Sequence, residues 1–209
     1  MKSEAMVIDA DGHILEPADL WEKYTEPKYR DRAIRIRVGD DGYEYLEVDG
    51  NRAKMTRQGQ LGTLGGMGKM VEESRRRREQ FIEAGRASEL RYEKPKPEDT
   101  YLKGAAFGTM DMKERLQLLD KEGMAKTILY PTIGLLWECE TMDADLSAAY
   151  ATAYNRWIAD FCRDSAGRLV PIAHLSLGDP EAAAFEGTLS DVKSGVVGSL
   201  KRVGARFRS

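Results

Sequence analysis

The sequence has 209 residues, of which 42% are hydrophobic and 32% are charged, a composition typical of a globular chain with its own core. Its 32 basic and 35 acidic side chains leave a formal net charge of -3, which gives no electrostatic reason to expect nucleic acid or an anionic membrane as a partner. Two cysteines without a CxxC pair give no sign of a disulfide scaffold or a structural zinc module, so a small-molecule substrate is the favoured partner.

The first residues lead directly into a short apolar run. Residues 1–6 lack the charged-then-apolar layout of a signal peptide, and no later apolar run approaches the ~20 residues that a membrane-spanning helix needs. A cytoplasmic location without membrane contact is therefore expected. The run Met6-Val7-Ile8 predicts a buried parallel strand, and the polar cluster that follows it places Asp11 and His13 at the strand's carboxyl end.

A short helix is expected next, because Pro17 can occupy its first turn while Leu20 and Trp21 pack inward, and it ends near Pro27. The character of the chain then changes over residues 30–98, which are interpreted as an insertion.

The insertion contains three kinds of segment. Residues 33–38 and 43–48 alternate apolar and polar side chains around an Asp-Asp-Gly turn, which predicts a hairpin. Five glycines over residues 59–68 predict a flexible loop that serves as a mobile lid. Residues 69–92 are compatible with a charged helix.

Strands and helices alternate regularly after residue 98. Asp111 is a candidate N-cap with Glu114 three residues on, and Gly123 ends that helix. The remaining expected elements are a strand over 126–131, a helix over 145–162, a strand over 168–175, a helix from 179 and a strand from 195. Such alternation favours an α/β fold with parallel strands, in a doubly wound sheet or a (β/α)8 barrel. Residues 1–29 and 99–209 together supply about half of the roughly 250 residues of a barrel.

The motif Asp11-Gly12-His13 carries the chemistry. Residues i and i+2 of an extended segment point the same way, so Asp11 and His13 can share one divalent ion. A carboxylate and an imidazole are ordinary ligands of zinc or manganese, although a catalytic zinc site has three protein ligands and an open position. The alternative is a strand-end cap in which Asp11 accepts hydrogen bonds from loop amides.

Residues 8–17, Ile-Asp-Ala-Asp-Gly-His-Ile-Leu-Glu-Pro, resemble the opening of the amidohydrolase-related family that includes aminocarboxymuconate-semialdehyde decarboxylase. The family pattern is I-D-x-H-x-H, and Asp11 stands where its first histidine usually stands. Three further stretches, 61–68, 111–136 and 153–180, are similar to the insertion loop and to the next strand and helix units of the same family.

This resemblance implies a fold, an activity and a set of site residues. The fold is the N-terminal part of a TIM barrel with a hairpin and helical insertion after its first strand. The activity is that of a metal-dependent hydrolase or non-oxidative decarboxylase, a carboxy-lyase, acting on a small carboxylated or cyclic substrate. Asp11 and His13 would bind the metal, with the acidic residue making manganese a candidate beside zinc, and Glu16 would orient His13 from behind.

The resemblance leaves the catalytic residues unassigned. His174 falls one strand before the family's next histidine ligand, where threonine or methionine is usual. It is therefore expected to be a hydrogen-bonded core histidine, with substrate contact or metal binding as alternatives.

Residues 201–209 form a basic tail where the family would continue into further strands, which predicts a truncated chain. The alternative function is accordingly a catalytically incomplete family member that acts as an interaction module or pseudoenzyme. A half-barrel exposes unpaired strand edges, so a homodimer is expected.

Overall fold

The computed structural model describes residues 6–86, 96–176 and 178, without the side chains of 67–75. The chain forms two compact units, the first comprising Met1–Arg35, Val48–Gly50 and Phe107–Ser209 and the second Ile36–Glu47 and Asn51–Ala106. The assignment of 1–29 and 99–209 to one barrel domain with an insertion over 30–98 stays a prediction. The expected helix from 179, the strand from 195 and the basic tail lie outside the described residues.

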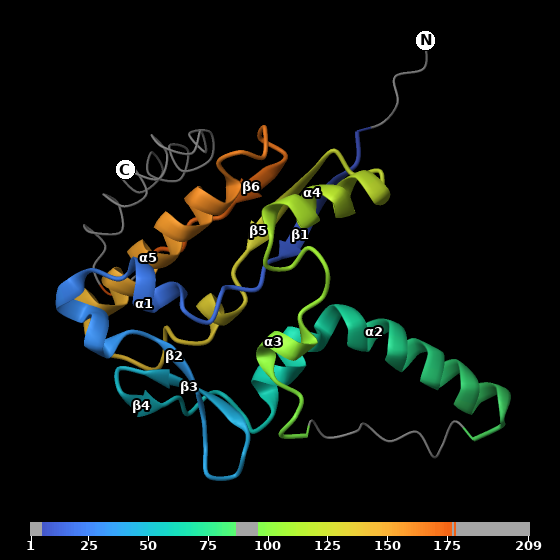
Figure 1. The fold of residues 1–209 in the computed structure, drawn as a ribbon, viewed down its shortest axis with the longest axis horizontal. Helices are drawn as coiled ribbons and strands as arrows, with labels where there is room; N and C mark the ends of the chain where they lie inside the picture. The colour runs from blue at the N-terminus through green and yellow to red at the C-terminus, as the bar shows by residue number, and fades with distance from the viewer. Residues whose placement is uncertain (1–5, 87–95, 177, 179–209) are drawn as a thin grey trace, which may run out of the picture. The chain divides into compact units, whose positions relative to one another are not determined.

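The first unit is built on a parallel sheet with strand order β1-β5-β6 (Figure 1). Helix α4 precedes β5, and helix α5 joins β5 to β6, so the predicted alternation of strands and helices is confirmed as a mixed α/β arrangement. Closure of the sheet into a barrel stays a prediction. The elements are β1 Ile8–His13, α1 Leu20–Tyr24, the 3-10 helix η1 Pro27–Arg32, α4 Met112–Lys121, β5 Lys126–Tyr130, the 3-10 helix η3 Ile133–Leu135, α5 Ala144–Cys162 and β6 Leu169–Pro171.

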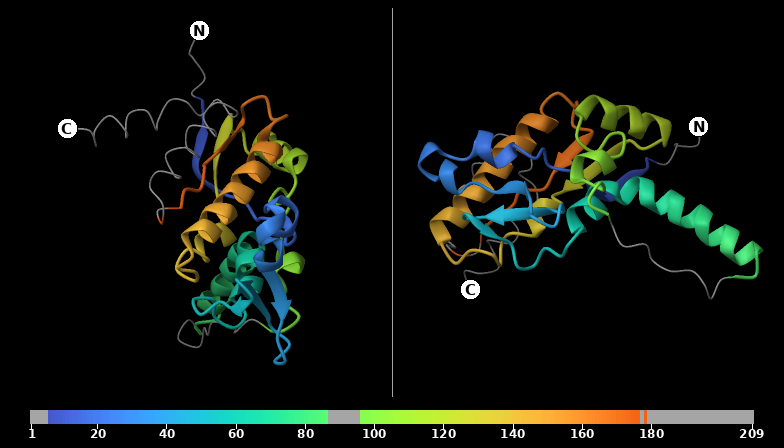
Figure 2. Two further views of the ribbon diagram at one scale, coloured as in Figure 1. Left: turned by 90° about the vertical axis from the view of Figure 1, so that its left-hand side faces the viewer. Right: turned by 60° about the horizontal axis from the view of Figure 1, so that its bottom comes forward.

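Aspartates begin both long helices of this unit. The Asp111 side chain accepts the backbone N–H of Glu114 at 2.9 Å, as the sequence predicts, and Asp143 accepts that of Leu146 at 3.1 Å at the start of α5. After α4, Gly123 takes a left-handed φ of 68°, which confirms it as the terminating residue. Helix α5 packs on β6, and α1 lies beside α5 in both views of Figure 2.

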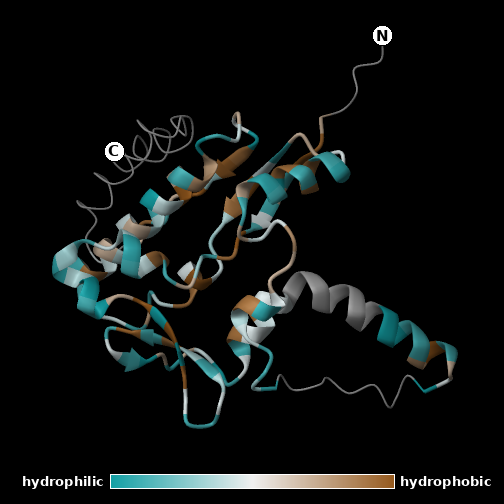
Figure 3. Ribbon diagram, viewed as in Figure 1, coloured by the Kyte–Doolittle hydropathy of each residue, from teal (hydrophilic) through white to brown (hydrophobic). Residues whose placement is uncertain are grey.

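The core of the first unit lies between the sheet and α5. Figure 3 shows hydrophobic residues along β5 and β6, where Leu129 and Leu169 are buried. The apolar run Met6-Val7-Ile8 behaves differently, since these side chains are 64%, 52% and 45% exposed and the strand begins only at Ile8. The prediction of a buried strand over residues 6–8 is therefore wrong. The physical reason is that β1 has only β5 as a sheet neighbour in the described part of the chain.

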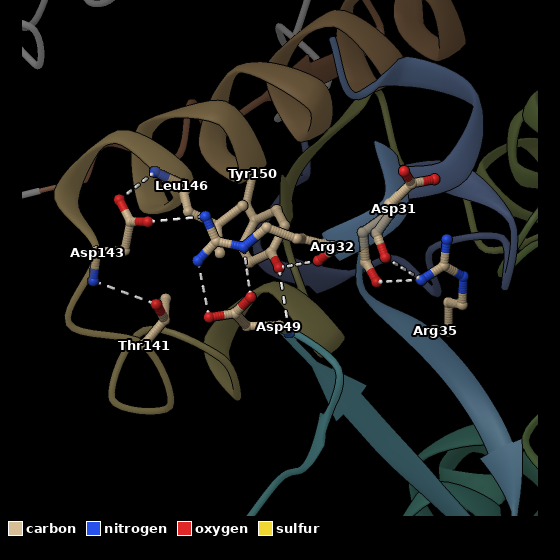
Figure 4. Close-up of polar contacts among 9 residues, drawn as sticks. Asp31, Arg32, Arg35, Asp49, Thr141, Asp143, Leu146 and Tyr150 are labelled. Atoms are coloured by element: carbon tan, nitrogen blue, oxygen red, sulfur yellow. Dashed lines mark hydrogen bonds and ion pairs between the residues drawn. The ribbon is translucent and has the colours of Figure 1, made fainter. Parts of the chain in front are cut away.

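A polar network fixes the turn at Asp49 in the first unit (Figure 4). Arg32 donates to Asp49 Oδ2 at 2.8 Å through Nη2 and to Asp143 Oδ2 at 2.9 Å through Nη1. The Tyr150 hydroxyl donates to the Arg32 carbonyl and accepts the backbone N–H of Asp49 at 3.3 Å. These bonds tie the end of η1, the turn and the first turns of α5 together.

The second unit contains the predicted hairpin. Strands β2, β3 and β4 form a sheet in that order, and the turn between the first two closes where the N–H of Gly39 donates to the carbonyl of Tyr43 at 2.9 Å. The elements are β2 Arg35–Val38, β3 Glu44–Val48, β4 Asn51–Arg52, α2 Gln60–Glu83 and α3 Tyr101–Gly104.

The glycine-rich stretch 59–68 is helical, so its interpretation as a flexible loop and mobile lid is wrong. Gly59 caps α2 in a left-handed conformation, and the later glycines lie inside the helix. A Cβ on Gly62 would lie 1.8 Å from the Asp99 carbonyl oxygen, and one on Gly65 would lie 2.0 Å from that of Tyr101. The glycines therefore allow close packing of α2 on α3 and its leading segment, which outweighs their poor helix propensity.

Candidate functional site

The predicted metal-binding motif lies in an irregular part of β1. The register of β1 on β5 shifts between Asp9 and Gly12, so that Ala10 and Asp11 occupy a β-bulge. A Cβ on Gly12 would lie 2.2 Å from the Thr127 hydroxyl oxygen, so only glycine fits at position 12. Bulges of this kind redirect side chains, here at the carboxyl end of a parallel strand.

Two charged side chains hold the bulge in shape. Asp9 accepts the backbone N–H of Asp11 at 3.1 Å through one oxygen and the Thr127 hydroxyl at 2.8 Å through the other. From α4, Arg115 donates to the backbone carbonyl of His13. Burial lowers the pKa of Arg115, and the charge of Asp9 opposes this effect. The backbone of residues 9–13 is thus fixed by charged hydrogen bonds.

The imidazole of His13 has a defined orientation. Its Nδ1 lies 2.9 Å from the carbonyl oxygen of Pro131 and 3.4 Å from the hydroxyl oxygen of Thr132, both just after β5. Because a carbonyl oxygen can only accept, Nδ1 carries a hydrogen, and the lone pair of the neutral ring resides on Nε2. This is the arrangement in which a histidine can bind a metal ion.

Asp11 and His13 are both exposed, whereas Gly12 between them is buried. Ala10 is exposed as well, because residues 10 and 11 lie in the bulge, so the regular alternation of a strand does not by itself place Asp11 on the face of His13. Among the residues that the structure describes, no three His, Cys, Asp or Glu side chains gather closely enough to hold a metal ion. Binding of one ion by Asp11 and His13 stays a prediction.

Glu16 is fully buried and caps the turn after β5. Its Oε1 accepts the backbone N–H groups of Thr132 and Gly134 at 2.9 Å, and its Oε2 accepts that of Ile133 at 3.0 Å. Burial raises the pKa of Glu16 above its ordinary value, and the three amide bonds oppose that rise. The link from Glu16 to His13 runs through Thr132, whose hydroxyl contacts the imidazole. Glu16 thus holds the turn that orients His13.

His174 lies three residues after β6 and is 8% exposed. Its Nε2 is 2.8 Å from a carboxylate oxygen of Glu138, and its backbone exchanges two hydrogen bonds of 2.8 Å with the Asn155 amide. The ring stacks on Trp137 at a centroid distance of 5.0 Å and meets the edge of Tyr154 at 6.1 Å. His174 is thus a buried, hydrogen-bonded histidine, while contact with substrate or metal stays a prediction.

Sequence reasoning missed the residues that contact His13 and His174. Pro131 and Thr132 follow a predicted strand directly, so the rule that placed Asp11 and His13 at a strand end could also have selected them. Glu138 lies in an irregular segment between η3 and α5, where nothing in its local pattern indicates that it reaches His174.

A solved structure supports the fold. The chain is similar to an amidohydrolase from Mycobacterium avium subsp. paratuberculosis K-10, with a TM-score of 0.62 and 18% sequence identity over 90% of this chain. The match covers 47% of that protein, so this chain spans about half of its length. No protein-family model and no curated protein matches the sequence. Within the described residues, no helix is long and apolar enough to cross a membrane.

Proposed function

We propose that this chain contributes the first part of the metal site of an amidohydrolase-type enzyme. The reaction is hydrolysis or non-oxidative decarboxylation of a small carboxylated or cyclic substrate. Asp11 and His13 bind the ion, and Thr132 supports His13 from the turn after β5, which Glu16 holds in place. The fold similarity to an amidohydrolase supports this reaction class, and the resemblance of residues 8–17 to the amidohydrolase-related family supports the placement of the ligands.

The orientation of His13 is the observation that carries the proposal. The Pro131 carbonyl takes up Nδ1–H, so the Nε2 lone pair is left to face a ligand. The Thr132 hydroxyl donates to the Ile14 carbonyl at 2.7 Å, which fixes its oxygen beside the same Nδ1. A histidine that served only as a surface residue would not need its ring held by two groups of a neighbouring strand end.

The donor set fits zinc or manganese in part. A carboxylate and an imidazole suit either ion, and an ion bound there would supply an activated water and a positive charge for a carbonyl or carboxylate oxygen. Two ligands fall short of the three that a catalytic zinc site normally has. The proposal therefore requires further ligands from outside the described residues.

Metal analysis tests the proposal. Wild type, Asp11→Ala and His13→Ala would be equilibrated with zinc or manganese, freed of unbound ion and analysed by mass spectrometry for bound metal. We expect a loss of at least tenfold in metal affinity for each variant, which corresponds to about 1.4 kcal/mol. Asp164→Ala, at an exposed aspartate after α5, is the matched control.

Equal metal content in all four proteins would refute the assignment of Asp11 and His13. Binding of manganese but not zinc would support the idea that the aspartate at position 11 selects manganese. Circular dichroism on each variant separates loss of ligand from loss of fold.

A second candidate function is a catalytically incomplete chain that acts as an interaction module. The exposed run Met6-Val7-Ile8, which leads into β1, favours it, because apolar side chains at a sheet edge attract another chain. A homodimer is the simplest such assembly. Light scattering during gel filtration would show a dimer, and Ile8→Lys would weaken it; a monodisperse monomer would refute this candidate.

A further inference from the structure

His174 and Glu138 form a carboxylate–histidine pair at the carboxyl end of the sheet. The Nε2–Oε1 distance is 2.8 Å, and the ring is buried whereas the carboxylate side chain is 53% exposed. A carboxylate can only accept, so Nε2 carries the hydrogen and Nδ1 of the neutral ring holds the lone pair. His174 is thereby set in the opposite tautomer from His13.

The Nδ1 atom of His174 is the unusual part of this pair. It is shielded from solvent and has no hydrogen-bond partner among the described residues. It lies 3.4 Å from the point where a Cβ on Gly134 would sit, and the same point is 3.3 Å from Glu16 Oε1. A buried acceptor without a partner costs about 1–3 kcal/mol, so its presence needs an explanation.

The aromatic neighbours explain the orientation of the His174 ring, but they do not explain why its Nδ1 has no hydrogen-bond partner among the described residues. Trp137 stacks on the imidazole and Tyr154 meets it edge-on, and the indole N–H and the phenol hydroxyl are themselves buried without a hydrogen-bond partner in the part of the chain that the structure describes. Among the described residues, three polar atoms of one aromatic cluster therefore have no hydrogen-bond partner. Each buried polar group without a partner calls for an explanation, and a catalytic role is one of them.

We infer that Glu138 is a positioning residue that fixes the tautomer of His174, so that His174 Nδ1 is a proton acceptor for the reaction at the sheet's carboxyl end. His13 is the last residue of β1 and His174 lies three residues after β6, and β1 and β6 flank β5, so the two strands are about 10 Å apart. The inference rests on the proposed function, in which His13 and Asp11 bind the metal ion.

The step itself is a proton transfer. Because Nδ1 is closed to solvent in the unbound chain, the proposed step requires a substrate hydroxyl that enters beside Gly134. The Nδ1 lone pair then takes the proton of this hydroxyl, so that an O–H bond breaks and an N–H bond forms. The oxygen keeps the electron pair, and the imidazolium that results lies beside the Glu138 carboxylate, which stabilises its charge. Glu138 does not need to take the proton.

Nitrogen NMR on the full chain tests the inference directly. The sequence contains only two histidines, so a long-range proton–nitrogen correlation spectrum shows two ring patterns, and His174→Asn assigns them. We expect the Nδ1–H form for His13 and the Nε2–H form for His174. Glu138→Ala should change the tautomer ratio of His174 at least about tenfold toward Nδ1–H, because a hydrogen bond to a charged acceptor is lost.

Two variants control for general effects on the fold. Glu138→Gln keeps an oxygen that can accept from Nε2–H and should retain the wild-type tautomer, whereas Glu122→Ala removes an exposed carboxylate at the end of α4 and should change nothing. An Nδ1–H form of His174 in wild type, or an unchanged ratio in Glu138→Ala, would overturn the inference.

Zinc titration in the same spectra separates this inference from the proposed function. Zinc alone should shift Nε2 of His13 and leave Nδ1 of His174 in place. A coordination shift at His174 Nδ1 would make it a ligand and overturn its role as a proton acceptor. Absence of a shift at His13 would contradict the proposed metal site, while the tautomer measurement would still decide the role of Glu138.

Discussion

Replacement of Glu16 tests how much of the candidate site depends on one buried carboxylate. In Glu16→Ala the backbone N–H groups of Thr132, Ile133 and Gly134 lose their acceptor inside the protein. Each unpaired buried donor costs about 1–3 kcal/mol, so the loss would be about 3–9 kcal/mol if the turn held its position. Relief of the desolvated carboxylate and entry of water reduce this figure, and we expect about 3 kcal/mol.

Glu16→Gln should cost less than the alanine variant. The amide oxygen can still accept from two of the three N–H groups, but the NH2 group meets the third, so we expect a loss of about 1–2 kcal/mol. Burial raises the pKa of Glu16 above 4.5, so the folded state binds this proton more tightly than the unfolded state does. Its contribution is complete below pH ~4.5 and is lost as the pH rises through the folded-state pKa. The stability of wild type relative to Glu16→Gln should fall accordingly.

Urea unfolding followed by circular dichroism measures these differences, and thermal unfolding should show a decrease in Tm of about 6–12 °C for the alanine variant. Glu122→Ala, at an exposed position, is the control and should change the free energy of unfolding by less than about 0.5 kcal/mol. A loss below about 1 kcal/mol in Glu16→Ala would refute the reasoning, since the three amide groups would then have adequate partners without the carboxylate.

Three further predictions concern other parts of the chain. Arg32→Ala should lower the free energy of unfolding at pH 7 by about 1–2 kcal/mol, since the pair with Asp49 is partly exposed, and a pH series of urea unfolding should show this difference shrinking below pH ~3.8. The sign follows because Arg32 lowers the pKa of Asp49, and stability gained that way is lost as the pH falls; a constant difference would contradict it. Gly65→Ala should lower the Tm of the chain by several degrees, because its Cβ would lie 2.0 Å from a backbone oxygen of α3, and an unchanged Tm would show that the two helices separate freely. Cys139 is exposed and should react at once with a thiol reagent, whereas burial raises the pKa of Cys162 to about 12 and should delay its reaction until urea is added; two fast thiols in the native protein would contradict the burial.

Local patterns predicted the helix boundaries well where side chains satisfy the backbone nearby. The cap at Asp111 and the terminating Gly123 depend on bonds within a few residues, and both are confirmed. The glycines of residues 59–68 led to the wrong prediction of a loop for the opposite reason. Their role comes from α3, about forty residues away in the sequence, whose backbone approaches too closely for any side chain.

The candidate site shows the same limit. Its position at strand ends followed from the polar residues after an apolar run, yet the bulge at Ala10 and Asp11 depends on the register with β5 and has no local signal. The contact between Glu138 and His174 joins residues 36 positions apart across an irregular segment. A contact between residues so far apart in the sequence can be identified only from the fold, because the spacing of residues in an irregular segment does not indicate where their side chains point.

The polar network that includes Arg32, Asp49 and Tyr150 also determines where the length of the chain can vary. It holds residues 32 and 49 together from within the first unit, so the hairpin between them begins and ends at fixed points. Chain length between two fixed points can vary at a small entropic cost, about 0.6 kcal/mol for each doubling. The hairpin between them can therefore change in length without moving residues 32 and 49.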